Sequence, residues 1–214
     1  MLVAISKNRF REWNKDYVIF PEVIEGKINT EKFLDASQQL VQLIDKFGKL
    51  FAPMKYDMQQ NINKLNVKYN IDRDNHSTLQ DMILIEKTSE NNKIATEALL
   101  WLRRGLYMIQ LFFEKIVQDY KSGQITEDLV ACLKKSYKEA LEPYHGWMAQ
   151  QLFGLLARMV PTRTQLLQVL TNGNEEKENE VLQNIDELCK GLKINILYLQ
   201  IFYDLHHLNN HERV

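Results

Sequence analysis

The feature that most constrains the fold is one long run without proline, residues 91–123, NNKIATEALLWLRRGLYMIQLFFEKIVQDYKSG. Its large apolar residues point in all directions around a helix, and Gly105 is its only glycine before Ser122-Gly123 ends the run. A helix that is apolar on every side has to be covered by other elements. The run therefore predicts the central helix of a helical bundle.

The rest of the chain is also helical in pattern. Apolar residues at three- and four-residue spacing predict further helices over 29–47, 53–69, 77–88, 126–142, 144–160 and 178–208, and a short one after Pro161. Thr30 and Thr126 are the predicted N-caps. No segment alternates with a period of two for long enough to form a strand. We expect an all-α domain over residues 29–214, preceded by an N-terminal arm, residues 1–28, with a possible short helix.

Composition excludes several classes of partner. The formal net charge is −1 at pH 7, so no bulk charge attracts nucleic acid. The first residues hold too short an apolar run for a signal peptide. The longest stretch without Lys, Arg, Asp or Glu, residues 143–157, is shorter than the roughly 18–20 residues of a spanning helix. We expect a soluble, cytoplasmic protein.

A polar stripe lies beside the apolar face of the helix over 53–69. Asp57, Asn61 and Lys64 follow one another at four and three residues, so they share one face of that helix. A carboxylate, an amide and an ammonium group offer donors and acceptors that suit a ligand with many hydroxyl groups, such as a sugar. The alternative is a solvated face with an ordinary Asp–Lys pair.

Aromatic residues mark two further stretches. Trp101 is either a core residue beside a close helix contact at Gly105 or a flat stacking surface at the mouth of a cavity. Arg103 and Arg104 follow it and are expected where the helix reaches water. His145 is either a structural or a binding residue. Trp147 is either partly buried or an anchor at a membrane interface.

No motif supports catalysis or metal binding. The chain contains no nucleotide-binding glycine pattern, no nucleophile elbow and no H-E-x-x-H. His206, His207 and His211 could approach one another, but no carboxylate or cysteine completes a metal site. We therefore expect no catalytic residue, no metal and no enzyme activity.

Three stretches in this order resemble the glycolipid transfer protein family: FGKLFAPMKYDMQQNINKL, ALLWLRRGL followed by QLFFEKI, and YHGWMAQQLF. The resemblance covers roughly residues 30–205. It implies an all-α fold of about eight helices in two layers, without a cofactor, that encloses an apolar lipid pocket. It also implies non-enzymatic transfer of glycosphingolipids, such as glucosyl- or galactosylceramide, between membranes.

The resemblance assigns a role to each candidate residue. Asp57, Asn61 and Lys64 would bind the first sugar, with Asp57 also accepting from the ceramide amide N–H. Trp101 would stack on that sugar, and His145 would donate to the amide carbonyl. The apolar helix faces suggest chain-pocket residues Phe33, Leu34, Phe112, Leu152, Phe153 and Leu156, and membrane contact through Trp147 and Met148. We expect a monomer that touches membranes transiently.

Two alternatives stay open. A second branch of the superfamily binds ceramide-1-phosphate; it resembles this chain at Asp57 and His145 but carries lysine in place of Asn61 and arginine in place of Trp101. A glycolipid sensor is the other alternative. The chain departs from the glycolipid branch at Glu97, at Pro143 and at the C-terminus, HHLNNHERV, which lacks a tyrosine near the chain end.

Overall fold

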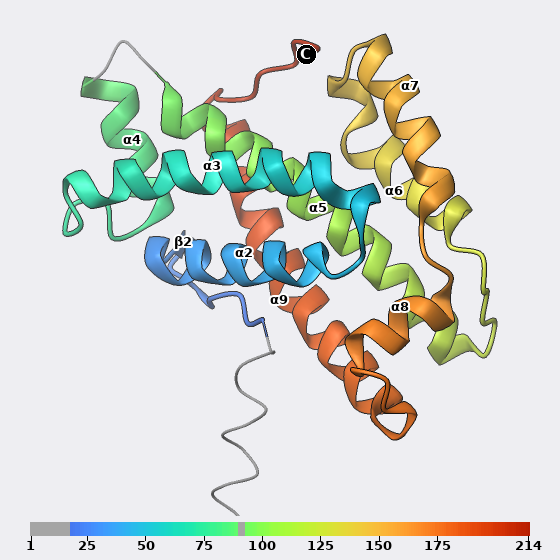
Figure 1. Ribbon diagram of the computed structural model, residues 1–214. Helices are drawn as coiled ribbons and strands as arrows, with labels where there is room; N and C mark the ends of the chain where they lie inside the picture. The colour runs from blue at the N-terminus through green and yellow to red at the C-terminus, as the bar shows by residue number, and fades with distance from the viewer. Residues whose placement is uncertain (1–17, 90–92) are drawn as a thin grey trace, which may run out of the picture.

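The computed structural model describes residues 18–89 and 93–214. Within these residues the chain forms eight α-helices, which confirms the all-α prediction (Figure 1). They are α2 (Thr30–Asp45), α3 (Ala52–Ile71), α4 (Leu79–Ser89), α5 (Ile94–Ser122), α6 (Val130–Ala140), α7 (Trp147–Leu156), α8 (Arg163–Leu170) and α9 (Glu178–Leu205). Short 3₁₀ turns lie at η1 (Lys49–Phe51), η2 (Glu142–Tyr144), η3 (Ala157–Met159) and η4 (Glu175–Lys177).

Helix α5 is the central element, as its sequence predicts. It packs against α3, α4, α6 and α9, and buried residues lie on all its sides. Helices α2 and α3 pack together and lie across α5 in Figure 1, while α9 packs against α5 as well. The bundle therefore buries α5 between layers. Separately, none of the described helices is both long and apolar enough to cross a bilayer.

Helices α3 and α5 pack tightly against each other at Gly105. A Cβ atom at this position would lie 3.3 Å from Cγ of Met58, which is itself fully buried. The missing side chain thus lets the two helices cross at short range, as one of the two sequence interpretations expected.

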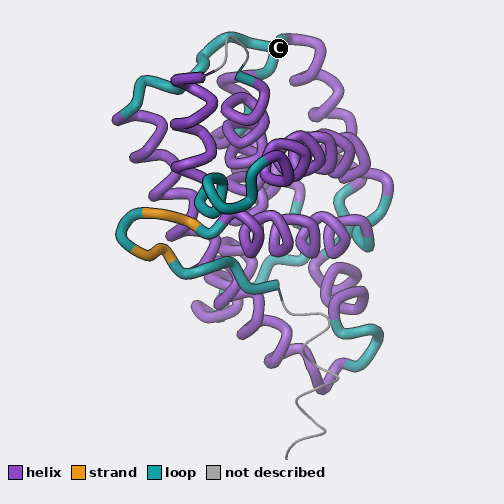
Figure 2. Tube along the Cα trace, turned by 90° about the vertical axis from the view of Figure 1, so that its left-hand side faces the viewer, coloured by secondary structure: helices purple, strands orange, loops and turns teal. Residues whose placement is uncertain are grey.

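One prediction about strands is wrong. Val23–Ile24 and Lys27–Ile28 form a small antiparallel hairpin (Figure 2), joined through Glu25 and Gly26, whose φ angles are 52° and 78°. Strands of two residues are too short to produce a period-two pattern. Residues 18–28 therefore contain no helix, and residues 1–17, where the rest of the predicted arm falls, lie outside the described part of the chain.

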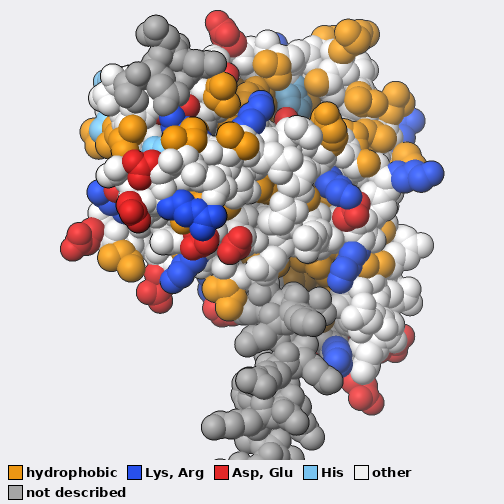
Figure 3. All heavy atoms as spheres, turned by 60° about the vertical axis from the view of Figure 1, so that its left-hand side comes forward, with side chains coloured by type: hydrophobic (Ala, Val, Ile, Leu, Met, Phe, Trp, Pro, Cys, Tyr) orange, Lys and Arg blue, Asp and Glu red, His pale blue; other side chains and the backbone are white. Residues whose placement is uncertain are grey.

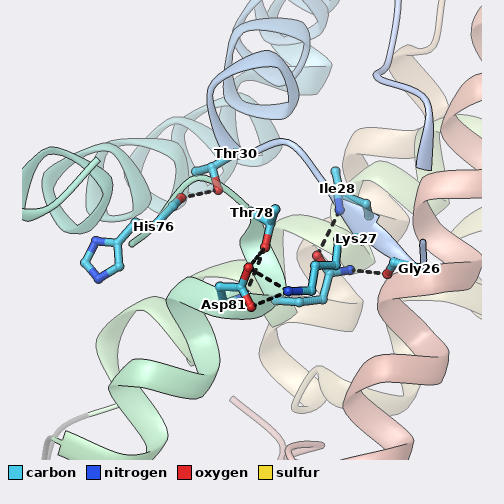
Figure 4. Close-up of polar contacts among 8 residues, drawn as sticks. Gly26, Lys27, Ile28, Thr30, His76, Thr78 and Asp81 are labelled. Carbon is cyan, nitrogen blue, oxygen red and sulfur yellow. Dashed lines mark hydrogen bonds and ion pairs between the residues drawn. The ribbon is translucent and has the colours of Figure 1, made fainter. Parts of the chain in front are cut away.

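The hairpin fastens the start of α4. Lys27 Nζ pairs with Asp81 Oδ1 at 2.7 Å, and Gln80 accepts from the Ile28 amide at 3.0 Å while its own amide donates to the Gly26 carbonyl (Figure 4). Thr30 Oγ1 donates to the His76 carbonyl at 2.7 Å. The chain before α2 is thereby attached to the turn between α3 and α4.

Both predicted N-caps are wrong by position. Asn29, not Thr30, caps α2, because its side chain accepts from the Lys32 amide at 2.9 Å. Thr30 is instead drawn into the buried contact with His76. Helix α6 begins at Val130, later than Thr126, and Asp128 accepts from the Val130 amide at 2.8 Å.

Candidate functional site

The polar stripe of α3 forms a connected group. Asn61 is buried, and its Nδ2 donates to Asp57 Oδ2 at 3.2 Å, while Lys64 is exposed one turn further along. Asp57 is exposed as a residue, but the atoms that crowd its carboxyl group remove water and raise its pKa. The Asn61 hydrogen bond and the Lys64 charge oppose this shift only in part. Asp57 is therefore an incompletely solvated acceptor.

Aromatic rings gather at the neighbouring part of α5. Trp101 is half-buried, and its ring lies nearly parallel to that of His145, with centroids 5.9 Å apart and an interplanar angle of 20°. Tyr144 meets Trp101 edge-on at 6.5 Å. The structure thus brings together α5 and the segment between α6 and α7, which are far apart in sequence.

His145 is held by a second element. Tyr137 of α6 lies with its hydroxyl 2.9 Å from His145 Nδ1. Burial, reinforced by the positive charge of Arg104, lowers the pKa of His145, so the ring is neutral at pH 7. Burial also raises the pKa of Tyr137 to about 12, so that its hydroxyl keeps its proton. When Tyr137 donates to Nδ1, the ring proton lies on Nε2, which can then donate to a ligand carbonyl.

Arg103 and Arg104 do not lie where the helix reaches water, although the sequence led us to expect them there. Both are buried, with Arg103 5% and Arg104 3% exposed, because α5 is covered by α9 and the C-terminal segment at this point. Arg103 donates to Gln200, and Arg104 donates to the carbonyl of Asn210. The charge next to Trp101 is therefore enclosed by protein.

The C-terminal segment completes this region, although it lacks the tyrosine that the family resemblance led us to look for near the chain end. Val214 donates from its amide to the Tyr144 carbonyl at 3.0 Å and accepts from the Gly146 amide at 2.6 Å. His211 stacks on Tyr144 with centroids 6.3 Å apart. Tyr144 and Gly146, which flank His145, are thus both hydrogen-bonded to the backbone of Val214.

An apolar pocket with a cavity volume of about 10 Å³ lies between α3 and α5, beyond Gly105 along α5. It is lined by Ile44, Phe47, Phe51, Met54, Met108, Ile109, Phe112, Phe113 and Leu133. Of the six predicted chain-pocket residues, Phe112 is the one that lines it. The pocket thus lies where α2, η1 and the start of α3 meet α5 and α6.

The other predicted chain-pocket residues lie elsewhere. Phe33 and Leu34 are in the closed core, where Phe33 packs on Phe20 at 5.6 Å. Phe153 stacks on Tyr137 with centroids 3.6 Å apart, and Leu156 is half-buried. Leu152 is 52% exposed and lies on the surface of α7. Helical spacing identified apolar faces but could not indicate which faces meet around the pocket.

Helix α7 carries a row of exposed apolar side chains. Trp147 and Met148 are 72% and 78% exposed, and the same helix or the turn after it exposes Leu152, Leu155 and Met159. A group of this kind is typical of a surface that meets a membrane or a partner. The predicted membrane residues are therefore accessible.

Neither the charges on the face shown in Figure 3 nor the metal-binding side chains of the described residues form a second candidate site. On the face shown in Figure 3, cationic and anionic side chains are interspersed. Among the residues that the structure describes, no three His, Cys, Asp or Glu side chains are placed to hold a metal ion.

Comparison with known proteins decides the family. Residues 28–172 match the family model described as Glycolipid transfer protein. This match covers more than half of the chain. The chain belongs to the glycolipid transfer protein family.

Two relatives place this glycolipid transfer protein family member among curated proteins. It is 34% identical over 166 residues to the zebrafish (Danio rerio) glycolipid transfer protein, a match that covers 75% of this chain and 79% of the relative. It is 31% identical over 203 residues to the rat (Rattus norvegicus) pleckstrin homology domain-containing family A member 8. That match covers 90% of this chain but 38% of the rat protein, so the chain spans well under half of that relative's length.

Solved structures of the family have the same fold. The structure that describes how FAPP2 selects simple glycosphingolipids superposes with a TM-score of 0.79 at 30% identity, covering 90% of this chain and 93% of that one. HET-C2, a fungal glycolipid transfer protein, gives 0.77 at 26% identity, with 91% and 96% covered. Mouse ceramide-1-phosphate transfer protein gives 0.77 at 16% identity, with 90% and 94% covered, a likeness of fold alone.

Proposed function

We propose that this chain binds a glycosphingolipid with a single sugar and carries it between membranes as a monomer, on their cytoplasmic side and without chemical change to the lipid. The observation that carries the proposal is the arrangement of the α3–α5 crossing. The Asp57–Asn61 pair lies on α3 beside Met58, and Trp101, stacked on His145, lies about one turn before Gly105 on α5, where Gly105 meets Met58. The apolar pocket is lined by Met54 of α3 and by residues that follow Gly105 on α5.

Each headgroup contact follows from the chemistry of its residue. Asp57, poorly solvated without ligand, gains hydrogen bonds from the sugar hydroxyls and the ceramide amide N–H. Asn61 and Lys64 bind further hydroxyl groups, and Trp101 offers an aromatic face to the sugar ring. His145 has a lowered pKa, and when Nδ1 accepts from Tyr137 its Nε2–H donates to the amide carbonyl.

The hydrocarbon chains enter the apolar pocket, which has to widen for them. Its cavity volume of about 10 Å³ has room for about one water molecule and lies far below the ~300–1,000 Å³ that drug-sized ligands occupy. Each CH₂ group moved from water into an apolar site stabilises the complex by about 0.8 kcal/mol. The gain from two chains therefore offsets the rearrangement of the aromatic side chains that now fill this space, Phe47, Phe51, Phe112 and Phe113.

Ceramide-1-phosphate is the second candidate ligand, and the arginines disfavour it. A phosphate requires cations that can turn toward it. Arg103 is engaged with Gln200 and Tyr203, and Arg104 with Asn210 and two aromatic rings. Lys64 is the one cation of the polar stripe, and it is exposed.

A vesicle assay tests the choice of ligand. We expect glucosyl- or galactosylceramide to move from donor to acceptor vesicles and ceramide-1-phosphate to move much more slowly. Asp57→Val or Trp101→Ala should abolish glycolipid transfer without loss of helical structure. Faster transfer of the phosphate lipid would assign the chain to the other branch. Strong glycolipid binding with negligible transfer would indicate a sensor.

A further inference from the structure

Arg104 contacts three separate parts of the chain at the headgroup site. Its guanidinium carbon lies 3.4 Å from the centroid of the Tyr144 ring and 4.7 Å from that of Trp101. Its Nη2 also donates to the carbonyl of Asn210 in the C-terminal segment. A single planar cation thus touches α5, η2 and the segment after α9.

The charge of Arg104 has no carboxylate partner among the described residues. No ion pair to it is present there, and its Nε is buried without a hydrogen-bond acceptor. Desolvation lowers its pKa to about 10, so it remains charged at pH 7. An enclosed charge of this kind is a poor source of stability. The faces of two aromatic rings, a hydrogen bond with the Tyr144 side chain and the Asn210 carbonyl oxygen compensate it.

These contacts surround His145. Tyr144 precedes His145, and Gly146 follows it, so fixing Tyr144 and its pairing with Val214 fixes the backbone that carries the imidazole. On the other side, Trp101 stacks with the imidazole and lies under Arg104. The ring that stacks on the imidazole, Trp101, and the residue that precedes it, Tyr144, are therefore both in contact with the same guanidinium.

We propose that Arg104 is a positioning residue, which orients Trp101 and Tyr144 for the headgroup and joins the site to the C-terminal segment without touching the ligand itself. The proposal rests on the proposed function, because the headgroup in question is that of the glycosphingolipid which Trp101 and His145 would bind. A lysine could keep the charge but not the planar contact with two rings and a carbonyl oxygen.

The experiment compares two probes of equal chain length, glucosylceramide and ceramide, in equilibrium binding to the whole chain. Arg104→Met should reduce the affinity for glucosylceramide about tenfold or more and leave ceramide within about twofold. Arg104→Lys should stay closer to Arg104→Met than to the unchanged protein. Arg103→Met is the matched control, since Arg103 is equally buried but contacts Gln200 and Tyr203. It should not change the ratio of the two affinities.

An optical measurement gives an independent readout. With Trp13 and Trp147 replaced by phenylalanine, near-ultraviolet circular dichroism and fluorescence report on Trp101. Arg104→Met should change both signals, and Arg103→Met should change neither. Equal losses for both lipids, or full rescue by Arg104→Lys, would overturn the proposal. If the unchanged protein does not prefer glucosylceramide to ceramide, the proposed function is wrong. The positioning role has its own test, because an unaltered Trp101 signal in Arg104→Met would overturn it whatever the lipid preference.

Discussion

At the scale of single residues, Asp57 shows a conflict between binding and stability. Its carboxyl group is held where burial raises the pKa, so the folded protein carries an ionised group that water would stabilise better. The hydrogen bonds that the carboxylate lacks in the free protein are those that a ligand with amide and hydroxyl groups would supply. Removing the charge should therefore have opposite effects on folding and on binding.

We expect Asp57→Asn to raise the melting temperature at pH 7 and to lower glycolipid affinity by about 10–100-fold, the loss of a charged hydrogen bond. The folded-state pKa of Asp57 lies above its unfolded value, so the unchanged protein gains stability as the pH falls through the folded pKa. The difference in melting temperature should thus be largest near neutral pH and shrink on acidification. Thermal scans from pH 4 to 7.5 measure it.

Asp35→Asn is the control for this prediction. Asp35 is exposed on α2, and its replacement should leave both the melting temperature and the affinity unchanged. An Asp57→Asn protein that is less stable than the unchanged one at pH 7 would contradict the argument.

At the scale of helices, α5 begins with an unusual cap. Glu86 of α4 is 1% exposed, and its carboxylate accepts from the amides of Ala95 and Thr96 at 2.9 and 2.8 Å and from Thr96 Oγ1 at 2.7 Å. A carboxylate at the N-terminus of a helix satisfies free amides and interacts favourably with the helix dipole. The orientation of the central helix is thereby tied to α4.

Glu86→Ala should lower the free energy of unfolding by about 2–4 kcal/mol, because it leaves buried donors without acceptors. Urea unfolding followed by circular dichroism measures this loss. Gln118→Ala, an exposed position in the interior of α5, should change stability by less than about 0.5 kcal/mol. Equal effects of the two substitutions would show that the buried contacts contribute nothing.

A pair of glycines tests the crossing of α3 and α5. In a helix interior, glycine to alanine stabilises by roughly 0.5–1 kcal/mol when the new methyl group has room. At Gly154 no atom lies within 4 Å of a Cβ, whereas at Gly105 Met58 Cγ lies at 3.3 Å in a packed core. We expect Gly154→Ala to stabilise the protein. The free energy of unfolding of Gly105→Ala should be at least about 1 kcal/mol lower than that of Gly154→Ala. Equal stabilisation in urea would indicate that the crossing is loose.

Periodicity was sufficient for some of these elements and not for others. The central helix and the Asp57 stripe were predictable because both depend on residues close in sequence. The burial of Arg104 and the pairing of Val214 with Gly146 depend on segments that meet only after folding. The pocket residues were mostly missed for the same reason, since spacing identifies an apolar face but not its partner.

At the scale of the whole molecule, headgroup binding and membrane contact involve different surfaces. Trp147 and Met148 are on the outside of α7, while the residues between α6 and α7 turn inward toward α5. An amphipathic ring at such an exposed position favours the interface between lipid headgroups and acyl chains. Transfer should therefore depend on Trp147 more than binding does.

Trp147→Asp should slow transfer between vesicles by about tenfold or more and leave binding of a short-chain, water-soluble glucosylceramide within about twofold. Ile201→Asp is the matched control, because Ile201 is also exposed and apolar but lies on α9. A loss of transfer in the Ile201 variant alone would place the membrane contact on α9 instead.

The contact of Gly105 with Met58 has a consequence for how lipid selectivity can vary. On α3, Asn61 follows Met58 and Met54 precedes it, and on α5, Trp101 precedes Gly105 and Phe112 follows it. At a rise of about 1.5 Å per residue these positions are separated by about 10 Å or more along each helix, and effects of substitutions at such a distance usually add. Preference for a sugar and preference for a chain length would then be separate properties, so that either could diverge among related proteins while the other stayed fixed.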